Sequence, residues 1–304
     1  MRIVFMGTPE IAAVCLDRLY RTGAEIVGVY TKQDTPQKRG MKMTFSAVKE
    51  TALAAGLPIL QPASFRDEET IDQLRRLRPD LVVVVAYGKI LPEAVLNIPP
   101  LGCVNIHASL LPALRGAAPV QRAVLAGSTE TGVTAMYMAR ELDAGDIIDS
   151  LRCEIGPNET SGELMEKLSD LGAQLLCRTV ARFAVGPVEG RPQDPQQVTW
   201  APMLTRQESP IDWTCPASEI HNRIRGLNPW PVAETILGGK RLRIYASEVL
   251  DEKSDLAAGT PLGVNKKGLD MVCGDGSVLR ILTVQADGGK RLAAPDYFRG
   301  HPLS

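Results

Sequence analysis

The chain opens with a strand, a helix and a second strand, and this order constrains its fold more than any other feature. Residues 2–6 form an apolar run that ends in the turn Gly7 to Glu10. Ile11 and Leu19 then belong to a set of apolar residues at helical spacing, and residues 24–30 form the next apolar run. Two strands joined through a helix lie parallel in one sheet. The sequence therefore predicts an α/β domain with a Rossmann-like, mostly parallel sheet and helices on both faces.

The turn after the first strand argues against one common function of such domains. Gly7-Thr8-Pro9-Glu10 contains a single glycine. The dinucleotide fingerprint GxGxxG needs three, for the tight turn, the approach of the phosphates and the packing of the helix. We expect Thr8 to cap the helix instead, with Pro9 at its first position. Nicotinamide binding is therefore not supported.

Charge and apolar content argue against a strongly basic nucleic-acid-binding protein and against a membrane protein. Lys and Arg number 34 against 35 Asp and Glu, which gives a formal net charge of -1, so only local basic patches are available for a nucleic acid. The longest purely apolar run, residues 81–87, is much shorter than the roughly 20 residues that span a bilayer. The apolar start is too short for a signal peptide. We expect a cytoplasmic monomer with no membrane contact.

Cysteine and histidine spacing argues against a metal site. The chain has 6 Cys and 3 His, and no two of the cysteines are close enough for a zinc-binding or redox CxxC pair. The histidines are scattered along the chain. We expect no metal.

Prolines divide the chain into two domains. Residues 186–202 contain Pro187, Pro192, Pro195 and Pro202, which interrupt any regular element. The sequence predicts a catalytic domain over residues 1–187, a linker over 188–207 and a second domain over 208–304. The last segment alternates short strands with glycine turns, a pattern typical of a small β-barrel of the OB type.

Three polar residues at the ends of predicted strands are the candidate catalytic group. Asn105 and His107 alternate on one strand and share a face, and Asp143 follows the next strand. A carboxylate beside a histidine orients the imidazole, and an imidazole with an asparagine amide can stabilise an oxyanion. The group contains no nucleophile of its own, so acyl-type transfer to a nucleophile on the substrate fits. The alternative is a core histidine satisfied by a neighbouring amide.

Two groups of basic residues are candidates for binding an anionic partner. The first lies in the polar segment 31–44, and the second lies on a strand of the C-terminal domain. Either group is also compatible with an ordinary solvated surface. The first comprises Lys38, Arg39, Gly40 and Lys42, and the second comprises Lys240, Arg241 and Arg243.

Several motifs together resemble the folate-dependent formyltransferases. They are Asn105-Ile-His-Ala-Ser-Leu-Leu-Pro112, Arg115-Gly-Ala-Ala-Pro119, Leu142-Asp-Ala-Gly-Asp146, Ala86-Tyr-Gly-Lys-Ile-Leu-Pro92 and Gly226-Leu-Asn-Pro-Trp-Pro231. The resemblance covers nearly the whole chain. The last motif resembles the corresponding segment of one subgroup of the family. Members of that subgroup have an added C-terminal domain and formylate the methionine of initiator methionyl-tRNA.

The resemblance implies substrates and roles for particular residues. It implies 10-formyltetrahydrofolate as donor, with Asn105 and His107 at the oxygen of a tetrahedral intermediate and Asp143 as partner of His107. It implies that Arg39-Gly40 belongs to a loop that meets the tRNA acceptor stem. The folate site it implies comprises Ser109, Leu110, Leu111, Pro112, Gly88, Lys89, Ile90, Leu91, Tyr137 and Leu142.

The sequence departs from this family at a few positions, and other functions stay open. Ala108 replaces a frequent glycine, Gln37-Lys38 replaces an Ala-Gly pair, and Met203 replaces a linker lysine. One alternative is a formyltransferase that acts on a small amine, such as glycinamide ribonucleotide or an amino sugar. Another is a tRNA-binding protein without catalysis.

Overall fold

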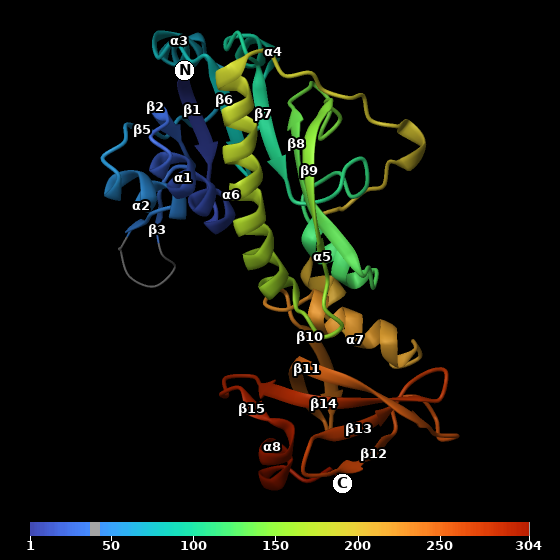
Figure 1. Ribbon diagram of the computed structural model, residues 1–304. Helices are drawn as coiled ribbons and strands as arrows, with labels where there is room; N and C mark the ends of the chain where they lie inside the picture. The colour runs from blue at the N-terminus through green and yellow to red at the C-terminus, as the bar shows by residue number, and fades with distance from the viewer. Residues whose placement is uncertain (37–42, 304) are drawn as a thin grey trace. The chain divides into compact units, whose positions relative to one another are not determined.

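The apolar runs of the first part of the chain form one twisted sheet in the computed structural model, which describes residues 1–36 and 43–303 (Figure 1). Its strand order is β5-β2-β1-β6-β7-β8-β9. The strands from β5 to β7 run parallel, and β8 runs antiparallel to β7. The strands are β1 (Arg2–Gly7), β2 (Glu25–Tyr30), β5 (Ile59–Leu60), β6 (Leu81–Val85), β7 (Cys103–His107), β8 (Glu130–Tyr137) and β9 (Ile147–Glu154).

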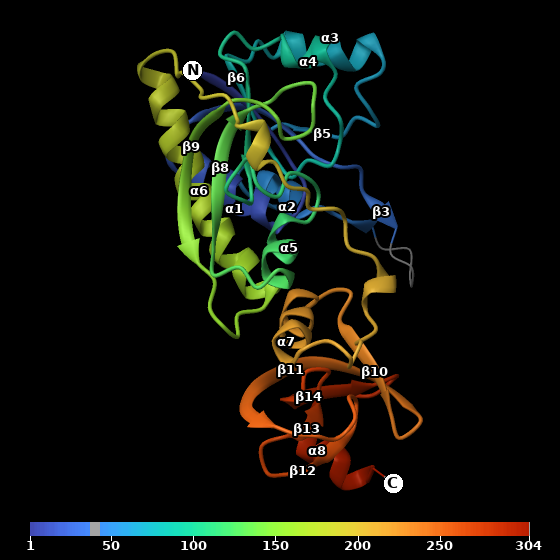
Figure 2. The ribbon, with the colours of Figure 1, turned by 90° about the vertical axis from the view of Figure 1, so that its right-hand side faces the viewer.

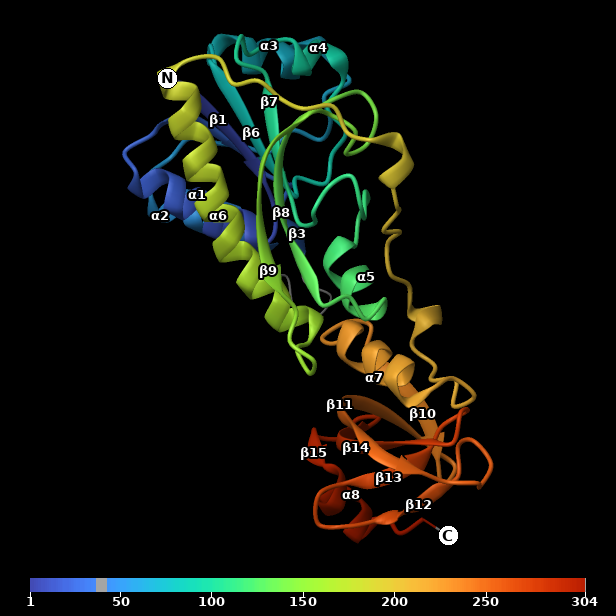
Figure 3. The same cartoon turned by 45° about the vertical axis from the view of Figure 1, so that its right-hand side comes forward.

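Helices cover both faces of this sheet (Figure 3). On one face, Gly172 of α6 packs so closely that a Cβ there would lie 3.3 Å from Ile106 of β7. On the other face, Leu74 of α3 shares a buried apolar cluster with Val82 and Val84 of β6. The predicted fold class is therefore confirmed for this part. The helices are α1 (Glu10–Arg21), α2 (Ala47–Ala54), α3 (Glu68–Arg76), α4 (Glu93–Leu96), α5 (Pro119–Leu125) and α6 (Ser161–Val185).

Side-chain caps begin three of these helices, but not the first. Thr160 caps α6 by accepting the backbone N–H of Glu163. Ser46 caps α2 and Asp67 caps α3, each by accepting a hydrogen bond from a backbone N–H of the first turn. The expectation that Thr8 caps α1 is wrong. Pro9 is the residue before α1, and the hydroxyl of Thr8 donates instead to the carbonyl of Tyr87, in the loop after β6.

The C-terminal part forms an antiparallel sheet with helices against it (Figure 2). Ile220 and Ile224 of α7 share a buried core with Leu242 and Ile244 of β11, and Phe298 of α8 belongs to the same core. The antiparallel C-terminal domain is confirmed. Its elements are α7 (Ala217–Gly226), β10 (Ala233–Leu237), β11 (Lys240–Lys253), β12 (Pro261–Val264), β13 (Leu269–Val272), β14 (Ser277–Ala286), β15 (Leu292–Ala293) and α8 (Ala294–Gly300).

Short elements complete the chain. The two-residue strands β3 (Thr35–Pro36) and β4 (Met43–Thr44) pair with each other on either side of residues 37–42. The 3-10 helices η1 (Pro195–Gln197) and η2 (Arg206–Glu208) lie between α6 and α7. None of the helices in the described stretches combines the length and apolar content that a bilayer crossing requires.

The described chain divides into two compact units that are not continuous in sequence. The first comprises Met1–Gly116, Thr131–Cys153 and Met165–Trp200, and the second comprises Ala117–Glu130, Glu154–Leu164 and Ala201–Ser304. Helix α5 and the start of α6 therefore belong with the C-terminal sheet. The boundaries 1–187, 188–207 and 208–304 stay a prediction.

Candidate active site

The end of β7 carries two polar side chains on one face of the sheet. Side chains alternate along a strand, and Ile106 faces α6, so Asn105 and His107 face the other side. Asn105 pairs in register with Val84, near the end of β6. The carboxamide of Asn105 is half-buried and hydrogen-bonds to no residue in the described stretches. It is therefore free to donate to a ligand at the edge where open α/β sheets bind their substrates.

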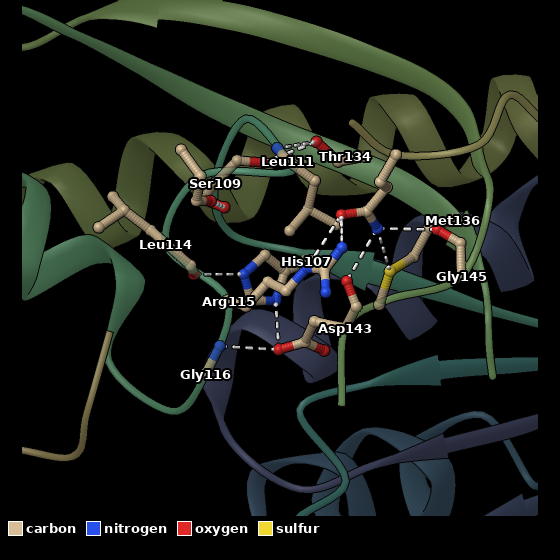
Figure 4. Close-up of polar contacts among 12 residues, drawn as sticks. His107, Ser109, Leu111, Leu114, Arg115, Gly116, Thr134, Met136, Asp143 and Gly145 are labelled. Carbon is tan, nitrogen blue, oxygen red and sulfur yellow. Dashed lines mark hydrogen bonds and ion pairs between the residues drawn. The ribbon is translucent and has the colours of Figure 1, made fainter. Parts of the chain in front are cut away.

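Both ring nitrogens of His107 face oxygen atoms (Figure 4). Nε2 lies 3.0 Å from the carbonyl oxygen of Leu114, and Nδ1 lies 3.6 Å from Oδ2 of Asp143. The second distance is an ion-pair distance, longer than a hydrogen bond. His107 is only 6% exposed. Because Nε2 contacts the carbonyl of Leu114, it can serve a substrate oxygen only by leaving Leu114.

Asp143 reaches His107 by a path that differs from the predicted one. The prediction placed Asp143 at the same edge as His107 because it follows the next strand. The strand direction behind that prediction is wrong, because β8 is antiparallel and Tyr137, at its end, pairs with Val104 near the start of β7. The segment 138–146 folds back over the sheet and brings the carboxylate to His107. There Oδ2 accepts the backbone N–H of Gly116 at 2.9 Å, and Asp143 has a left-handed backbone with φ 51.

Two residues that the sequence reading missed connect these segments. The carboxamide of Gln193 donates to the backbone carbonyls of Asp143 and Gly145, both at 2.8 Å, and accepts from the guanidinium of Arg115. Thr199 accepts the backbone N–H groups of Leu114 and Arg115. Both residues lie in the predicted linker, and a lone Gln or Thr in a proline-rich stretch gives no signal in one sequence.

The residues after His107 form a tight turn held from within. The hydroxyl of Ser109 donates to the carbonyl of Ala113 at 2.7 Å, and Ser109 is fully buried. Thr134 of β8 donates to the carbonyl of Ser109 and accepts from the N–H of Leu111. The Ser109 hydroxyl is therefore committed to the loop, while Leu110 and Pro112 are only half-buried.

The loop after β6 presents backbone and one exposed apolar side chain. Gly88 has φ 77, a left-handed conformation that glycine adopts without strain. Ile90 is 92% exposed, whereas Leu91 is buried. The ammonium of Lys89 donates to the carbonyls of Pro62 and Ala63, and burial, together with Lys32, lowers the pKa of Lys89. The Lys89 side chain thus supports this loop rather than pointing to a ligand.

Of two further residues of the implied folate site, Tyr137 faces away from the candidate catalytic group and Leu142 is exposed beside Asp143. Tyr137 pairs with Val104, so it faces the side opposite Asn105 and His107, where its ring packs edge-on against Phe183 of α6. The structure therefore does not bring Tyr137 to the site. Leu142, the neighbour of Asp143, is 62% exposed.

Two of the three candidate basic residues of the C-terminal sheet already have acidic partners. Arg241 makes two hydrogen bonds to Glu234, each 2.8 Å long. Arg243 forms an ion pair with Asp287 at 3.2 Å, and Lys240 is exposed. The other group, Lys38, Arg39, Gly40 and Lys42, lies outside the described residues. Within residues 1–36 and 43–303 no cluster of three His, Cys, Asp or Glu side chains is arranged to hold a metal ion.

Comparisons with known proteins identify family models over both parts of the chain. Residues 1–180 match the model described as formyl transferase, and residues 203–302 match formyl transferase, C-terminal domain. The methionyl-tRNA formyltransferase of Moorella thermoacetica is 46% identical over 303 residues, which cover 100% of this chain and 97% of that protein. That of Xanthomonas campestris pv. campestris is 48% identical over 299 residues, covering 98% and 96%.

Solved structures with low sequence identity share the fold. The N-formyltransferase from Helicobacter canadensis, solved with folinic acid and dTDP-3-aminofucose, has a TM-score of 0.71 at 18% identity and covers 93% of this chain and 98% of its own. Glycinamide ribonucleotide transformylase 1 from Symbiobacterium toebii has a TM-score of 0.54 at 21% identity, covering 64% and 94%. The second structure matches a smaller share of this chain.

Proposed function

The chain belongs to the formyl transferase family, and we propose that it transfers the formyl group of 10-formyltetrahydrofolate to the α-amino group of methionine on initiator methionyl-tRNA. The full-length similarity to methionyl-tRNA formyltransferases supports this acceptor, because it includes the C-terminal domain as well as the catalytic part. The glycinamide ribonucleotide transformylase from Symbiobacterium toebii, by contrast, covers only 64% of this chain.

One geometric observation carries the chemistry. A free carboxamide at Asn105 shares a face with His107, and the carboxylate of Asp143 lies 3.6 Å from the imidazole. Two donors beside a carboxylate fit a carbonyl that becomes an oxyanion next to an amine that loses a proton. The group lacks a serine or cysteine nucleophile, which fits direct attack by the amine.

The proposed reaction moves one formyl group and one proton. The neutral amine forms a bond to the formyl carbon, and the carbonyl electrons move to its oxygen. Asn105 donates to this oxygen, and His107 donates to it after its Nε2 leaves the carbonyl of Leu114. Asp143 orients the imidazole, and its carboxylate accepts the proton that the amine loses and passes it to the departing nitrogen of the folate. The carbon–nitrogen bond to the folate then breaks, and the departing nitrogen takes up a proton.

Loops around the site fit a flat heterocycle. Exposed apolar side chains at Ile90 and Leu142 stand on the loops after β6 and β8, where a pterin ring would cover them. Backbone groups of the Gly88–Leu91 and 109–112 turns would meet its amide-like edge. We propose these turns and Leu142 as the folate site, without Tyr137.

The tRNA contacts of the proposal rest on the basic residues. Arg39, with Gly40, would meet the acceptor stem, and Lys38 and Lys42 would add charge. The guanidinium of arginine can form bidentate hydrogen bonds with a phosphate or a base edge, whereas lysine acts as a point charge. Contacts from Lys240, Arg241 and Arg243 would require the arginines to exchange their acidic partners for phosphate. We propose that the enzyme acts as a monomer and without a metal ion.

The proposal is tested by offering the purified protein 10-formyltetrahydrofolate and methionyl initiator tRNA. The expected product is N-formylmethionyl-tRNA, identified by mass spectrometry of the aminoacyl adenosine released by nuclease. If the methionine stays unformylated while the donor is intact and the protein is folded, the proposal fails.

A further inference from the structure

The carboxamide of Gln193 joins the two segments that hold His107. Its Nε2 donates to the backbone carbonyls of Asp143 and Gly145 at 2.8 Å each. Its Oε1 accepts from Nε and Nη2 of Arg115 at 3.0 and 2.7 Å. Nε2 also makes a longer contact of 4.0 Å to Sδ of Met136. The short hydrogen bonds of this side chain therefore all go to residues 115 and 143–145.

The first of these segments is a strained, tightly packed turn. Asp143 has φ 51, which costs a residue with a side chain more than it costs glycine. At Gly145 an added Cβ would lie 1.8 Å from the carbonyl oxygen of Tyr137, so the turn has no room to relax toward β8. Two donors on its carbonyls stabilise this conformation, and the conformation directs the Asp143 carboxylate toward His107.

The second segment depends on a buried cation. Arg115 is 9% exposed, and Gln193 is the acceptor of its guanidinium within the described part of the chain. Burying an unpaired guanidinium is costly, so this pairing holds Arg115 in place. The residues on either side of Arg115 serve the site directly. The Leu114 carbonyl meets Nε2 of His107, and the Gly116 N–H donates to Asp143.

We infer that Gln193 is a positioning residue for formyl transfer, which acts by fixing the Asp143 turn against the 114–116 segment so that both ring nitrogens of His107 keep their partners. Gln193 touches none of the reacting groups itself. The expected loss of kcat rests on the proposed function. The expected change in the surroundings of the His107 ring does not. Part of the predicted linker thereby belongs to the catalytic apparatus.

The kinetic test combines Gln193→Leu with Asp143→Asn. Leucine has a similar volume but neither donates nor accepts. We expect Q193L to lower kcat by about 10²-fold, the scale of a misplaced catalytic group, with KM for methionyl-tRNA and affinity for folate within about twofold. In the D143N background the same change should lower kcat less than about threefold, because coupled residues are not additive. Equal losses in both backgrounds, or no loss in either, would overturn the inference.

Two controls separate positioning from folding. Gln197→Leu changes the same residue type in η1, where Gln197 bonds only to Asp194 in the described residues, and should leave kcat unchanged. Gln193→Glu keeps an acceptor for Arg115 but loses the donor for the carbonyls. If Q193L fails to fold, Q193E carries the test, with the same loss expected. Wild-type kcat in Q193E would overturn the role of the two carbonyl bonds.

A readout without turnover keeps this inference distinct from the proposed function. The chain has 3 His, so the imidazole resonances of protein labelled with ¹⁵N-histidine can be assigned with single variants. We expect Q193L to shift both ring nitrogens of His107 and to leave those of His221 and His301 in place. If the wild type formylates nothing, the proposed function fails while this shift still decides the inference. Unchanged His107 resonances in Q193L would overturn it.

Discussion

His107 is the residue on which the proposed chemistry depends most, and its surroundings explain why it is poised rather than free. Its ring is buried between a carbonyl and a carboxylate, both brought by segments that Gln193 joins. Because the ring of His107 is already oriented, little conformational entropy is lost when a substrate oxygen replaces the carbonyl of Leu114. The site is thus preorganised by its neighbours.

Replacing His107 with alanine should lower kcat by about 10²–10³-fold, because one oxyanion donor is lost. Binding of methionyl-tRNA, measured by filter retention, should change little, since the imidazole is buried. The matched control is His301→Ala, since the His301 ring bonds to a backbone carbonyl near the end of the chain. If turnover and tRNA binding fall together, His107 has a structural role only.

The role of Arg39 in tRNA binding is predicted from the sequence, since Arg39 lies outside the described residues. Changing Arg39 to alanine should lower kcat/KM for methionyl-tRNA about tenfold, the scale of one lost bidentate contact. Affinity for a folate analogue, followed by fluorescence, should stay the same. A specificity constant equal to the wild type's would reject the role of Arg39.

At the scale of elements, hydropathy patterns predicted the opening strand, helix and strand, but not the directions of the later strands. The apolar runs over residues 2–6 and 24–30 form β1 and β2, and the helical pattern between them forms α1. The antiparallel direction of β8 was not predictable, because the alternation of side chains is the same in both directions. Gln193 was missed because its role comes from tertiary contacts of a loop, which leave no periodic signal.

Helix α7 carries a buried histidine that links folding to pH. Nε2 of His221 donates to the Pro157 carbonyl at 3.0 Å, and Nδ1 accepts from the Ser247 hydroxyl at 2.9 Å. Burial lowers the pKa of His221 below 6.5, an effect larger than the opposing one of the Pro157 hydrogen bond. The neutral ring therefore belongs to the folded state.

This arrangement predicts a loss of stability on acidification. As the pH falls through about 6.5, the ordinary pKa of histidine, His221 becomes protonated in the unfolded chain but stays neutral in the folded chain. The free energy of unfolding therefore decreases. In His221→Gln this part of the pH dependence should vanish. Urea unfolding from pH 8 to pH 5, followed by tryptophan fluorescence, measures both proteins. A difference in stability that stays constant over this range contradicts the assignment.

At the scale of the whole molecule, the sequence predicted two domains, and the compact units interleave along the chain. Residues 117–130 and 154–164 group with the C-terminal sheet although they lie within the first family model. Proline content marks a break in regular structure but not which unit each flanking segment joins. The similarity to methionyl-tRNA formyltransferases extends through the C-terminal unit as well as the first one.

The most direct measurement is a competition in one reaction, with a limiting amount of labelled 10-formyltetrahydrofolate offered to methionyl initiator tRNA, glycinamide ribonucleotide and a nucleotide-linked amino sugar together. We predict that nearly all of the label appears on the methionine of the tRNA and that Asp143→Asn slows its appearance. Label on either small amine, with none on the tRNA, would contradict the account.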